Sequence, residues 1–486
     1  MLDDPDRECL ITEGSIFIFS STVVSFRKMK RGHNNVSALY KSSFHQTTSG
    51  FTVTRTLIKD LPGCIDQETI IKGFVETIRD QRFVQFVTIR DASGAVQIVN
   101  EKTPENEARS ALISQLTVGS TAAFTGKIVT APKVKLGGLE LQLRDINVYT
   151  WAKSPLPISA DSSFDKKIDQ RALSLRFPDQ QLIYKVQTTM VAAMHEFWAN
   201  NDFTIMYSPK LMETASESGA EVFKVDYFNR DAFLAQSPQF YKQMGVAGGI
   251  ERYAEIGPVF RADPSSTPRH NSEFISVDME MAWVDSHEDV MAMEEQFLAH
   301  VFNKVANAHS AEIEKIFGVK VTVPTLPFPR VTLKEAREIL AQKGHHIAVD
   351  DDLDPAGERL LGQHFLETQG HDFFFATEYP TKIRAFYHMR SEENPGVTKS
   401  FDLMYKGIEI TTGAQREHRI DILRQQAAER GLQEEHLQSY FNSFTYGCPP
   451  HGGLGLGFGR LLGGMLGQTG ITPVTFLPRT MTRLTP

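Results

Sequence analysis

With 486 residues the chain is long enough for about two to four domains, and its net charge of −8 and pI of about 6.0 exclude a uniformly basic nucleic-acid coat. Its three cysteines (Cys9, Cys64 and Cys448) contain no C-x-x-C pair, which argues against a disulfide framework or a zinc site and favours a reducing compartment. No apolar run reaches the roughly 18 residues that span a bilayer, so we expect no membrane partner.

Residues 1–50 are expected to form a disordered, basic and serine-rich arm that can contact RNA phosphates. After Glu13 no acidic residue occurs before Asp60, while lysine, arginine and serine accumulate. From Met29 onward this composition also resembles a transit peptide, although the acidic start of the chain speaks against one. We therefore expect a cytoplasmic protein and leave an organelle open if translation begins at Met29.

Residues 51–150 predict a small β-barrel. Five short strand patterns are separated by turn signals such as Asp91–Gly94, and a polar helix at about 104–115 lies between the third and fourth strands. This order fits a Greek-key barrel of the OB type, which commonly binds oligonucleotides on an aromatic and basic face. The candidates for that face are Phe74, Arg79, Arg82, Phe86 and Gln97. Barrel core is the alternative for the two phenylalanines.

A linker or hinge at 151–168 precedes a second, α+β domain at 169–486. In this domain Gln181–Ala199 carries the apolar spacing of an amphipathic helix, and Asp202–Tyr207 predicts a strand that stops at Pro209. Residues 219–284 alternate apolar and polar side chains between turns. They predict antiparallel strands without room for helical crossovers.

Residues 286–370 predict a helical insertion, in which Thr332–Glu335 is a capping box that opens one of the helices. The nearby His345-His346 and Asp350–Asp352 suggest either a metal site or, with more weight, a solvated loop. Beyond the insertion, strand patterns resume; they are Phe373–Ala376, Ala385–Met389 and Phe401–Thr412.

Residues 447–460 form a glycine-dense stretch, GCPPHGGLGLGFGR, that ends in Arg460. Glycine allows the backbone to approach a ligand closely, and arginine presents a planar fork of donors to phosphate. The stretch therefore suggests a nucleotide-phosphate site made from a strand, a tight turn and a helix. A packing element is the alternative, because a lone glycine motif is weak evidence.

Separated segments together resemble a class II aminoacyl-tRNA synthetase, and closely the aspartyl-tRNA synthetases of the archaeal or eukaryotic type. The helix at 181–199 with Pro209 is similar to the first family motif, residues 260–274 to the second, and the glycine-dense stretch with Arg460 to the third. The resemblance runs from about residue 51 to the end of the chain. It implies an anticodon-binding OB barrel, a catalytic domain built on an antiparallel sheet flanked by helices, and a homodimer.

The resemblance implies that aspartate and ATP form aspartyl-adenylate, from which the aspartyl group passes to the 3′ end of tRNA(Asp). The attacking carboxylate is already ionised, so the first step needs positioning and charge stabilisation and no general base. The matching ATP-binding residues are Arg261, Asp263, Arg269, His270, Phe274, Glu409, Gly457 and Arg460. Of these, Arg261, Glu409 and Arg460 are the expected catalytic residues. We expect Phe274 to stack on the adenine opposite Arg460.

Mg²⁺ is implied as the companion of ATP, with Asp402 and Glu409 as its carboxylate ligands. The implied aspartate-binding residues are Glu217, Gln239, Lys242, Asp278, Thr412 and Arg416. Within this set, Lys242 and Arg416 are expected to face the side-chain carboxylate and so favour aspartate over asparagine. In the barrel, the resemblance implies that Arg79, Phe86 and Gln97 contact anticodon bases.

Two positions depart from the family pattern: Asp263 stands where the second motif usually has glutamate, and Gly459 precedes Arg460 where an acidic residue is common. Glu76 occupies a barrel position that bears on tRNA choice and matches neither expected residue. Use of tRNA(Asp) alone, or of tRNA(Asp) and tRNA(Asn), therefore stays open. A catalytically silent RNA-binding paralogue is a third hypothesis, and the intact candidate site argues against it.

Overall fold

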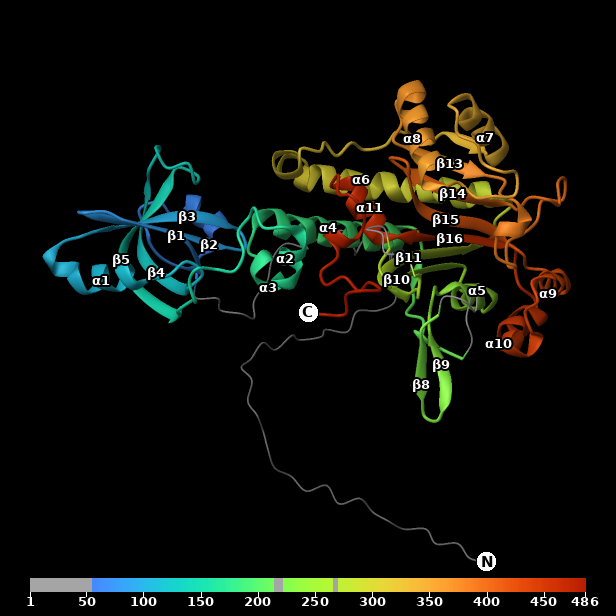
Figure 1. Cartoon of the computed structure of the whole chain (residues 1–486), viewed down its shortest axis with the longest axis horizontal. Coiled ribbons are helices and arrows are strands. Elements are labelled where there is room, and N and C mark those ends of the chain that lie inside the picture. Colours follow the sequence, from blue (N-terminus) through green and yellow to red (C-terminus); the bar gives the residue numbers. More distant parts are fainter. Residues whose placement is uncertain (1–54, 214–221, 265–269) are drawn as a thin grey trace, which may run out of the picture. The chain divides into compact units, whose positions relative to one another are not determined.

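The computed structural model describes residues 55–213, 222–264 and 270–486 (Figure 1). The predicted arm at 1–50 lies outside the described residues, as do two residues of the predicted site, Glu217 and Arg269. Within the described ranges, no helix is both long and apolar enough to cross a membrane.

The first domain is a closed five-stranded barrel, which confirms the predicted OB-type fold. Its strands are β1 (Glu68–Asp80), β2 (Val84–Asp91), β3 (Gly94–Glu101), β4 (Thr121–Thr130) and β5 (Leu139–Thr150), closed in the order β1-β2-β3-β5-β4. The predicted helix is η3 (Pro104–Asn106) followed by α1 (Glu107–Gln115). Burial alternates along β2, so Val87 lies in the core while Phe86 is half-buried on the outer face. Phe74 is likewise half-buried and outside the core cluster.

The second domain contains an eight-stranded sheet with the order β12-β13-β14-β15-β16-β11-β10-β6. The strands are β6 (Thr204–Ile205), β10 (Arg252–Phe260), β11 (Glu273–Ala282), β12 (Arg330–Thr332), β13 (Phe373–Thr377), β14 (Ser400–Tyr405), β15 (Ile408–Arg416) and β16 (His451–Gly457). The inner pairs are antiparallel, as predicted, and the end pairs β12–β13 and β10–β6 are parallel. Helical connections precede β10 and β13, which allows each to run parallel to the earlier strand beside it.

Residues 211–247 add a three-stranded sheet and a helix that the sequence analysis did not predict. The sheet has the order β7 (Leu211–Met212), β9 (Arg230–Leu234), β8 (Lys224–Tyr227), and the helix is α5 (Gln239–Ala247). Phe240 of α5 stacks on Tyr440 at 4.4 Å, so α5 packs against α10 (Glu434–Thr445), which lies beside α9 (Ile420–Glu429) (Figure 1). The prediction that residues 219–284 leave no room for a helical crossover is therefore wrong, because α5 lies on the connection from β6 to its parallel neighbour β10.

Long helices bury one face of the eight-stranded sheet. α4 (Pro178–Asn200) and α6 (His287–Phe317) pack side by side, and Trp198 of α4 stacks on Phe297 of α6 at 5.9 Å. Their apolar stripes share one core with Leu454 of β16 and Leu461 of α11 (Phe458–Met465). The predicted insertion at 286–370 is helical, but its α6 is thus part of the central core. Its remaining helices, α7 (Leu333–Gln342) and α8 (Pro355–Gln369), cover β13 through a second cluster.

Two local predictions have opposite outcomes. The capping box is confirmed, because the Thr332 hydroxyl accepts from the Glu335 amide at 3.2 Å while the Glu335 carboxylate accepts from the Thr332 amide at 2.9 Å. The predicted strand Ala385–Met389 is wrong, since it is a turn that follows η4 (Thr381–Ile383) and makes only an isolated bridge from His388 to Arg416. The remaining short helices are η2 (Ile58–Cys64), α2 (Phe164–Asp169), α3 (Arg171–Ser174) and η5 (Thr472–Val474).

Glu294 of α6 supplies a test of this core. Burial raises the pKa of this fully enclosed carboxyl from 4.5 to about 8, and the nearby charges of Glu295 and Asp402 add to the effect. The folded state therefore keeps a proton that the unfolded state loses above pH 4.5, so stability falls by roughly 1.4 kcal/mol per pH unit up to about pH 8. We predict that Glu294→Gln removes this decline, as measured by urea unfolding at pH 5, 6.5 and 8. Parallel pH profiles for the variant and the parent protein would contradict the prediction.

Candidate active site

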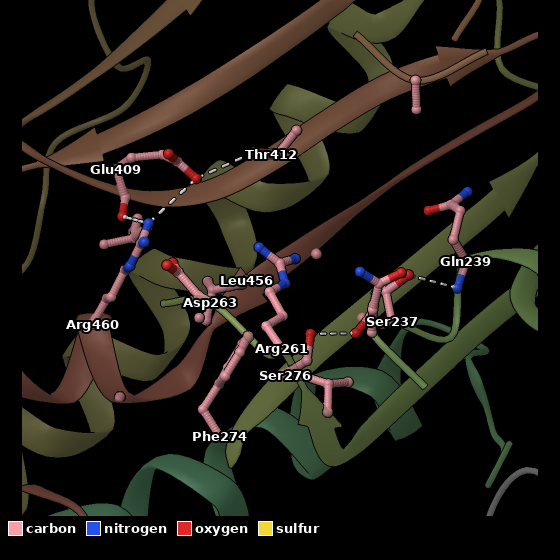
Figure 2. Close-up of a pocket in the computed structure, with 18 of the residues that line it drawn as sticks. Ser237, Gln239, Arg261, Asp263, Phe274, Ser276, Glu409, Thr412, Leu456 and Arg460 are labelled. Atoms are coloured by element: carbon pink, nitrogen blue, oxygen red, sulfur yellow. Dashed lines mark hydrogen bonds and ion pairs between the residues drawn. The ribbon is translucent and has the colours of Figure 1, made fainter. Parts of the chain in front are cut away.

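A cavity of about 480 Å³ opens at the sheet where β11, β15 and β16 lie side by side. Most of the residues predicted for ATP and aspartate line it, although they come from segments far apart in the sequence (Figure 2). They are Gln239, Lys242, Arg261, Asp263, His270, Phe274, Asp278, Glu409, Thr412, Arg416, Gly457 and Arg460. The described residues predicted for ATP and aspartate therefore gather in one place, whereas Asp402 does not line the cavity, and Glu217 and Arg269 lie outside the described residues.

The glycine-dense stretch runs straight from β16 into α11, as a strand followed by a helix with no intervening turn. Arg460, in the first turn of α11, points toward Glu409 of β15 (Figure 2). Its Nη1 donates to the Glu409 carbonyl at 2.8 Å and lies 3.3 Å from the carboxylate Oε1. A Cβ on the preceding Gly459 would lie 3.2 Å from Cβ of Ile471, so the departure from an acidic residue here accompanies tight packing against Ile471.

Arg261 and Phe274 occupy the opposite side of the cavity from Glu409 (Figure 2). The Arg261 guanidinium lies 5.5 Å from the Phe274 ring centre, within cation–π range. The guanidinium over this ring is thus that of Arg261, while Arg460 is turned toward Glu409. Asp263 projects into the same space, with its carboxylate 3.9 Å from Nε2 of His270.

The deepest part of the cavity wall is a buried network of charges. Lys242 of α5 has its Nζ 3.1 Å from Asp278 and 3.2 Å from Glu280, and it donates to the Leu454 carbonyl at 2.8 Å. Arg416 of β15 donates through Nε to Glu280 at 3.0 Å and through Nη2 to the Gly453 carbonyl at 2.9 Å. Both cations predicted to bind aspartate are therefore fixed in place by carboxylates of β11.

Glu280 was missed by the sequence analysis, although it is the residue that joins these two cations. It is fully buried, and although burial alone would raise its pKa, Arg416 and Lys242 together hold the pKa below its usual value. The signal was present in the sequence, because Glu280 follows Asp278 by two positions on one strand and so shares its face.

Glycines of β16 leave room for this network. In the strand register Asp278 lies opposite Gly455 and Glu280 opposite Gly453. A Cβ on Gly453 would fall 2.1 Å from Oε2 of Glu280, and one on Gly455 would fall 3.2 Å from Oδ1 of Asp278. The glycines thus make space for protein carboxylates at least as directly as for a nucleotide.

Asp402 and Glu409, the predicted magnesium ligands, differ in their environments. Asp402 of β14 is buried and accepts from Nη2 of Arg384 at 2.6 Å, while its Oδ1 has no hydrogen-bond partner among the described residues. Burial raises the pKa of Asp402 to about 6 despite the opposing charge of Arg384. The sequence analysis also assigned no role to Arg384, which directly precedes the wrongly predicted strand Ala385–Met389.

A free carboxylate oxygen on Asp402, together with the Glu409 carboxylate, is the oxygen donor set that Mg²⁺ prefers, so these residues fit the ion. No group of three or more His, Cys, Asp or Glu side chains within the described ranges is arranged to hold a metal. The two carboxylates alone would therefore leave most of the coordination shell to water and phosphate oxygens.

On the barrel, the three predicted anticodon contacts lie on adjacent strands. The Arg79 guanidinium is 5.0 Å from the Phe86 ring centre, and its Nη2 donates to Oε1 of Gln97 at 2.9 Å. Glu76, on the same strand as Arg79, forms an ion pair with Arg90 of β2. The barrel thus carries an aromatic ring and a cation on its outer face, whereas the Gln97 amide is buried and bonded to Arg79 and Glu140.

Comparisons with known proteins agree with this geometry. The family model described as tRNA synthetases class II (D, K and N) matches residues 163–481, and one described as an OB-fold nucleic acid binding domain matches residues 69–149. The chain belongs to the class II tRNA synthetases. It is therefore an aminoacyl-tRNA ligase, and the resemblance seen in the sequence is confirmed.

Relatives of this class II synthetase fall on both sides of the question of tRNA choice. An aspartate–tRNA(Asp) ligase of Pyrococcus abyssi is 40% identical over 86% of this chain and 95% of its own length. An aspartate–tRNA(Asp/Asn) ligase of Methanopyrus kandleri is also 40% identical, over 86% of this chain and 96% of its own. The solved asparaginyl-tRNA synthetase of Pyrococcus horikoshii with asparaginyl-adenylate superposes with a TM-score of 0.84 at 30% identity, covering 89% of this chain and all of that one.

We predict that Glu280→Gln destabilises the synthetase by about 3–5 kcal/mol, because it leaves Lys242 and Arg416 buried with one compensating carboxylate fewer. Urea unfolding measures the loss. The control is Glu288→Gln, which breaks a half-exposed pair with Arg330 and should cost less than about 1 kcal/mol. Equal losses for the two variants would show that the buried network is not a principal source of stability.

Proposed function

We propose that this synthetase is an aspartate–tRNA ligase that activates L-aspartate with ATP and transfers it to tRNA(Asp). The observation that carries the proposal is the arrangement of cations around one cavity. Lys242 and Arg416 border it at the buried network, Arg261 borders it beside Phe274, and Arg460 borders it beside the Glu409 carboxylate. A ligand with a carboxylate at one end and phosphates at the other matches this distribution of charge.

Selection of aspartate depends on how rigidly the carboxylate-binding groups are held. Arg416 has two of its N–H groups fixed by Glu280 and Gly453, which leaves the rest of its donor fork at the cavity. Lys242 is fixed by three acceptors. Donors held in place this way lose little entropy on binding a carboxylate, and the amide of asparagine would leave a buried charge less well compensated.

In the proposed first step, the α-carboxylate of aspartate attacks the α-phosphorus of ATP, a P–O bond forms, and pyrophosphate leaves with the electrons of the broken P–O bond. Arg261 binds the α-phosphate and the attacking carboxylate, so it stabilises the charge that accumulates there. Arg460 and His270 bind the outer phosphates, and Phe274 supports the adenine. Asp402 and Glu409 would hold Mg²⁺, which when bound neutralises phosphate charge.

In the second step, a ribose hydroxyl at the 3′ end of tRNA attacks the carbonyl carbon of the adenylate, and AMP leaves. The barrel is proposed to bind the anticodon through Phe86, Arg79 and Gln97. We further propose that the protein is a homodimer, in keeping with the similarity of α4 and Pro209 to the first family motif, and that it works in the cytoplasm.

Pyrophosphate exchange tests the activity directly. Purified protein with ATP and Mg²⁺ should exchange labelled pyrophosphate when aspartate is added, and much more slowly with asparagine. The proposal would be refuted if asparagine but not aspartate supported exchange, or if no exchange occurred with either amino acid.

Arg460→Ala is predicted to lower pyrophosphate exchange by at least about 100-fold, because it removes a cation that contacts the leaving phosphates. Binding of tRNA, measured by filter retention, should stay within about twofold. The control is Arg424→Ala on α9, which breaks an exposed pair with Glu434 away from the cavity and should keep full exchange activity. Normal exchange in the Arg460 variant would remove the phosphate role assigned to it.

Phe86→Ala is predicted to weaken tRNA binding by about 1–3 kcal/mol, the usual contribution of an aromatic ring that stacks on a base. The KM for tRNA should rise while pyrophosphate exchange is unchanged. Phe83→Ala is the matched control, because Phe83 is 69% exposed on the same barrel but lies outside the Arg79–Phe86–Gln97 cluster. An equal rise in both variants would refute the anticodon role of Phe86.

A synthetase that charges both tRNA(Asp) and tRNA(Asn) is the second candidate function. The chain is 40% identical both to a tRNA(Asp) relative and to a tRNA(Asp/Asn) relative, so identity separates neither function from the other, and Glu76 matches neither residue expected at its position. Aminoacylation of transcripts of both tRNAs with labelled aspartate decides between the two.

A further inference from the structure

Both carboxylates proposed to hold Mg²⁺ are already engaged by arginines. Asp402 accepts from Arg384 at 2.6 Å, and Glu409 lies 3.3 Å from Arg460. The first pair is buried, with side chains 9% and 4% exposed, whereas the second is 28% and 35% exposed. Two positive charges of the chain thus stand where a divalent cation would otherwise balance the two carboxylates.

Arg384 is held firmly at this position. Its guanidinium lies 3.6 Å from the ring centre of Tyr379, which follows shortly after β13, and Arg384 itself directly follows η4 in the chain. Its Nη2 donates to only one oxygen of Asp402, so the other oxygen, Oδ1, stays unpartnered among the described residues. Arg384 also lines the cavity. It therefore touches a predicted metal ligand on one side and the proposed nucleotide space on the other.

We propose that Arg384 and Arg460 act as placeholder cations: they neutralise Asp402 and Glu409 in the ligand-free protein and transfer to the triphosphate when Mg²⁺ and ATP bind. This inference rests on the proposed function of the cavity as an ATP site. Each arginine leaves a carboxylate for a phosphate, so it exchanges one anionic partner for another. Each carboxylate in turn becomes available to the metal, and no charge of the site is left buried without a partner at either stage.

This exchange links the two ligands energetically. A metal ion that arrives alone at the free Oδ1 of Asp402 would share this carboxylate with the buried Arg384 guanidinium on Oδ2, and the repulsion between the two cations is unfavourable. ATP removes this obstacle because its phosphates accept the arginine. Metal and nucleotide therefore strengthen each other's binding by the same factor. Arg384 dominates the effect, because the half-buried Arg460 is more accessible to water than Arg384 and can be solvated when it leaves Glu409.

Binding of Mn²⁺, measured by electron paramagnetic resonance, tests the inference without reference to catalysis. In the parent protein, Mn²⁺ should bind weakly alone and at least 10-fold more tightly when a non-hydrolysable ATP analogue is present. Arg384→Gln should bind Mn²⁺ without nucleotide at least 10-fold more tightly than the parent protein, and the analogue should then add less. Arg384→Lys keeps the positive charge and should restore weak binding in the absence of nucleotide.

The matched control is Arg390→Gln, which removes an ion pair with Glu429 at the surface and should leave Mn²⁺ binding unchanged. When Asp402→Asn is added to Arg384→Gln, the double variant should lose the tight Mn²⁺ binding of the single variant. Equal nucleotide-free affinities in the parent protein and Arg384→Gln would overturn the placeholder role while leaving the ATP site intact. Failure of the parent protein to bind Mn²⁺ even with the analogue would instead overturn the proposed function. If Arg384→Gln does not fold, the parent protein decides alone. Equal Mn²⁺ affinities with and without the ATP analogue would then overturn the inference.

Discussion

The catalytic domain depends on one buried arrangement of charge, in which Glu280 joins Arg416 and Lys242 beneath the cavity. Three strands and α5 meet at this point, so the network both holds the sheet together and fixes the donors that face the ligand. It exists only because β16 has almost no side chains where β11 presents its carboxylates. Stability and specificity are therefore set by the same few atoms.

Several cations of the site are paired with a carboxylate of the protein when no ligand is bound. Lys242 is paired with Asp278, Arg384 with Asp402, and Arg460 with Glu409. A protein with a net charge of −8 can thus place several cations around one binding site, and none of these paired charges is left buried and uncompensated when the ligand is absent. Each anionic group of a substrate then binds to a cation that already belongs to one of these ion pairs.

Local patterns were sufficient for much of the fold. Alternation and turn residues predicted the barrel, and helical spacing and a capping box located α4 and α7. What failed depended on partners distant in sequence: Ala385–Met389 has strand composition but is a turn anchored to Arg416, and α5 is stabilised by Tyr440, about 200 positions away. The site residues were chosen through family motifs, so those motifs did not reveal Glu280 and Arg384, whose roles consist of pairing with other residues.

The bare backbone of β16 limits how the pocket can be altered. Gly455 and Gly457 line the cavity and are already the smallest residues available, so no substitution at these two positions can enlarge the space for a longer amino acid. Additional volume has to come from Leu456 of the same strand, from α5 or from the turn that carries Tyr387 and His388, all of which line the cavity. Attempts to engineer the enzyme toward non-natural amino acids should therefore randomise Leu456, the helix and the turn, and leave the glycines of the strand untouched.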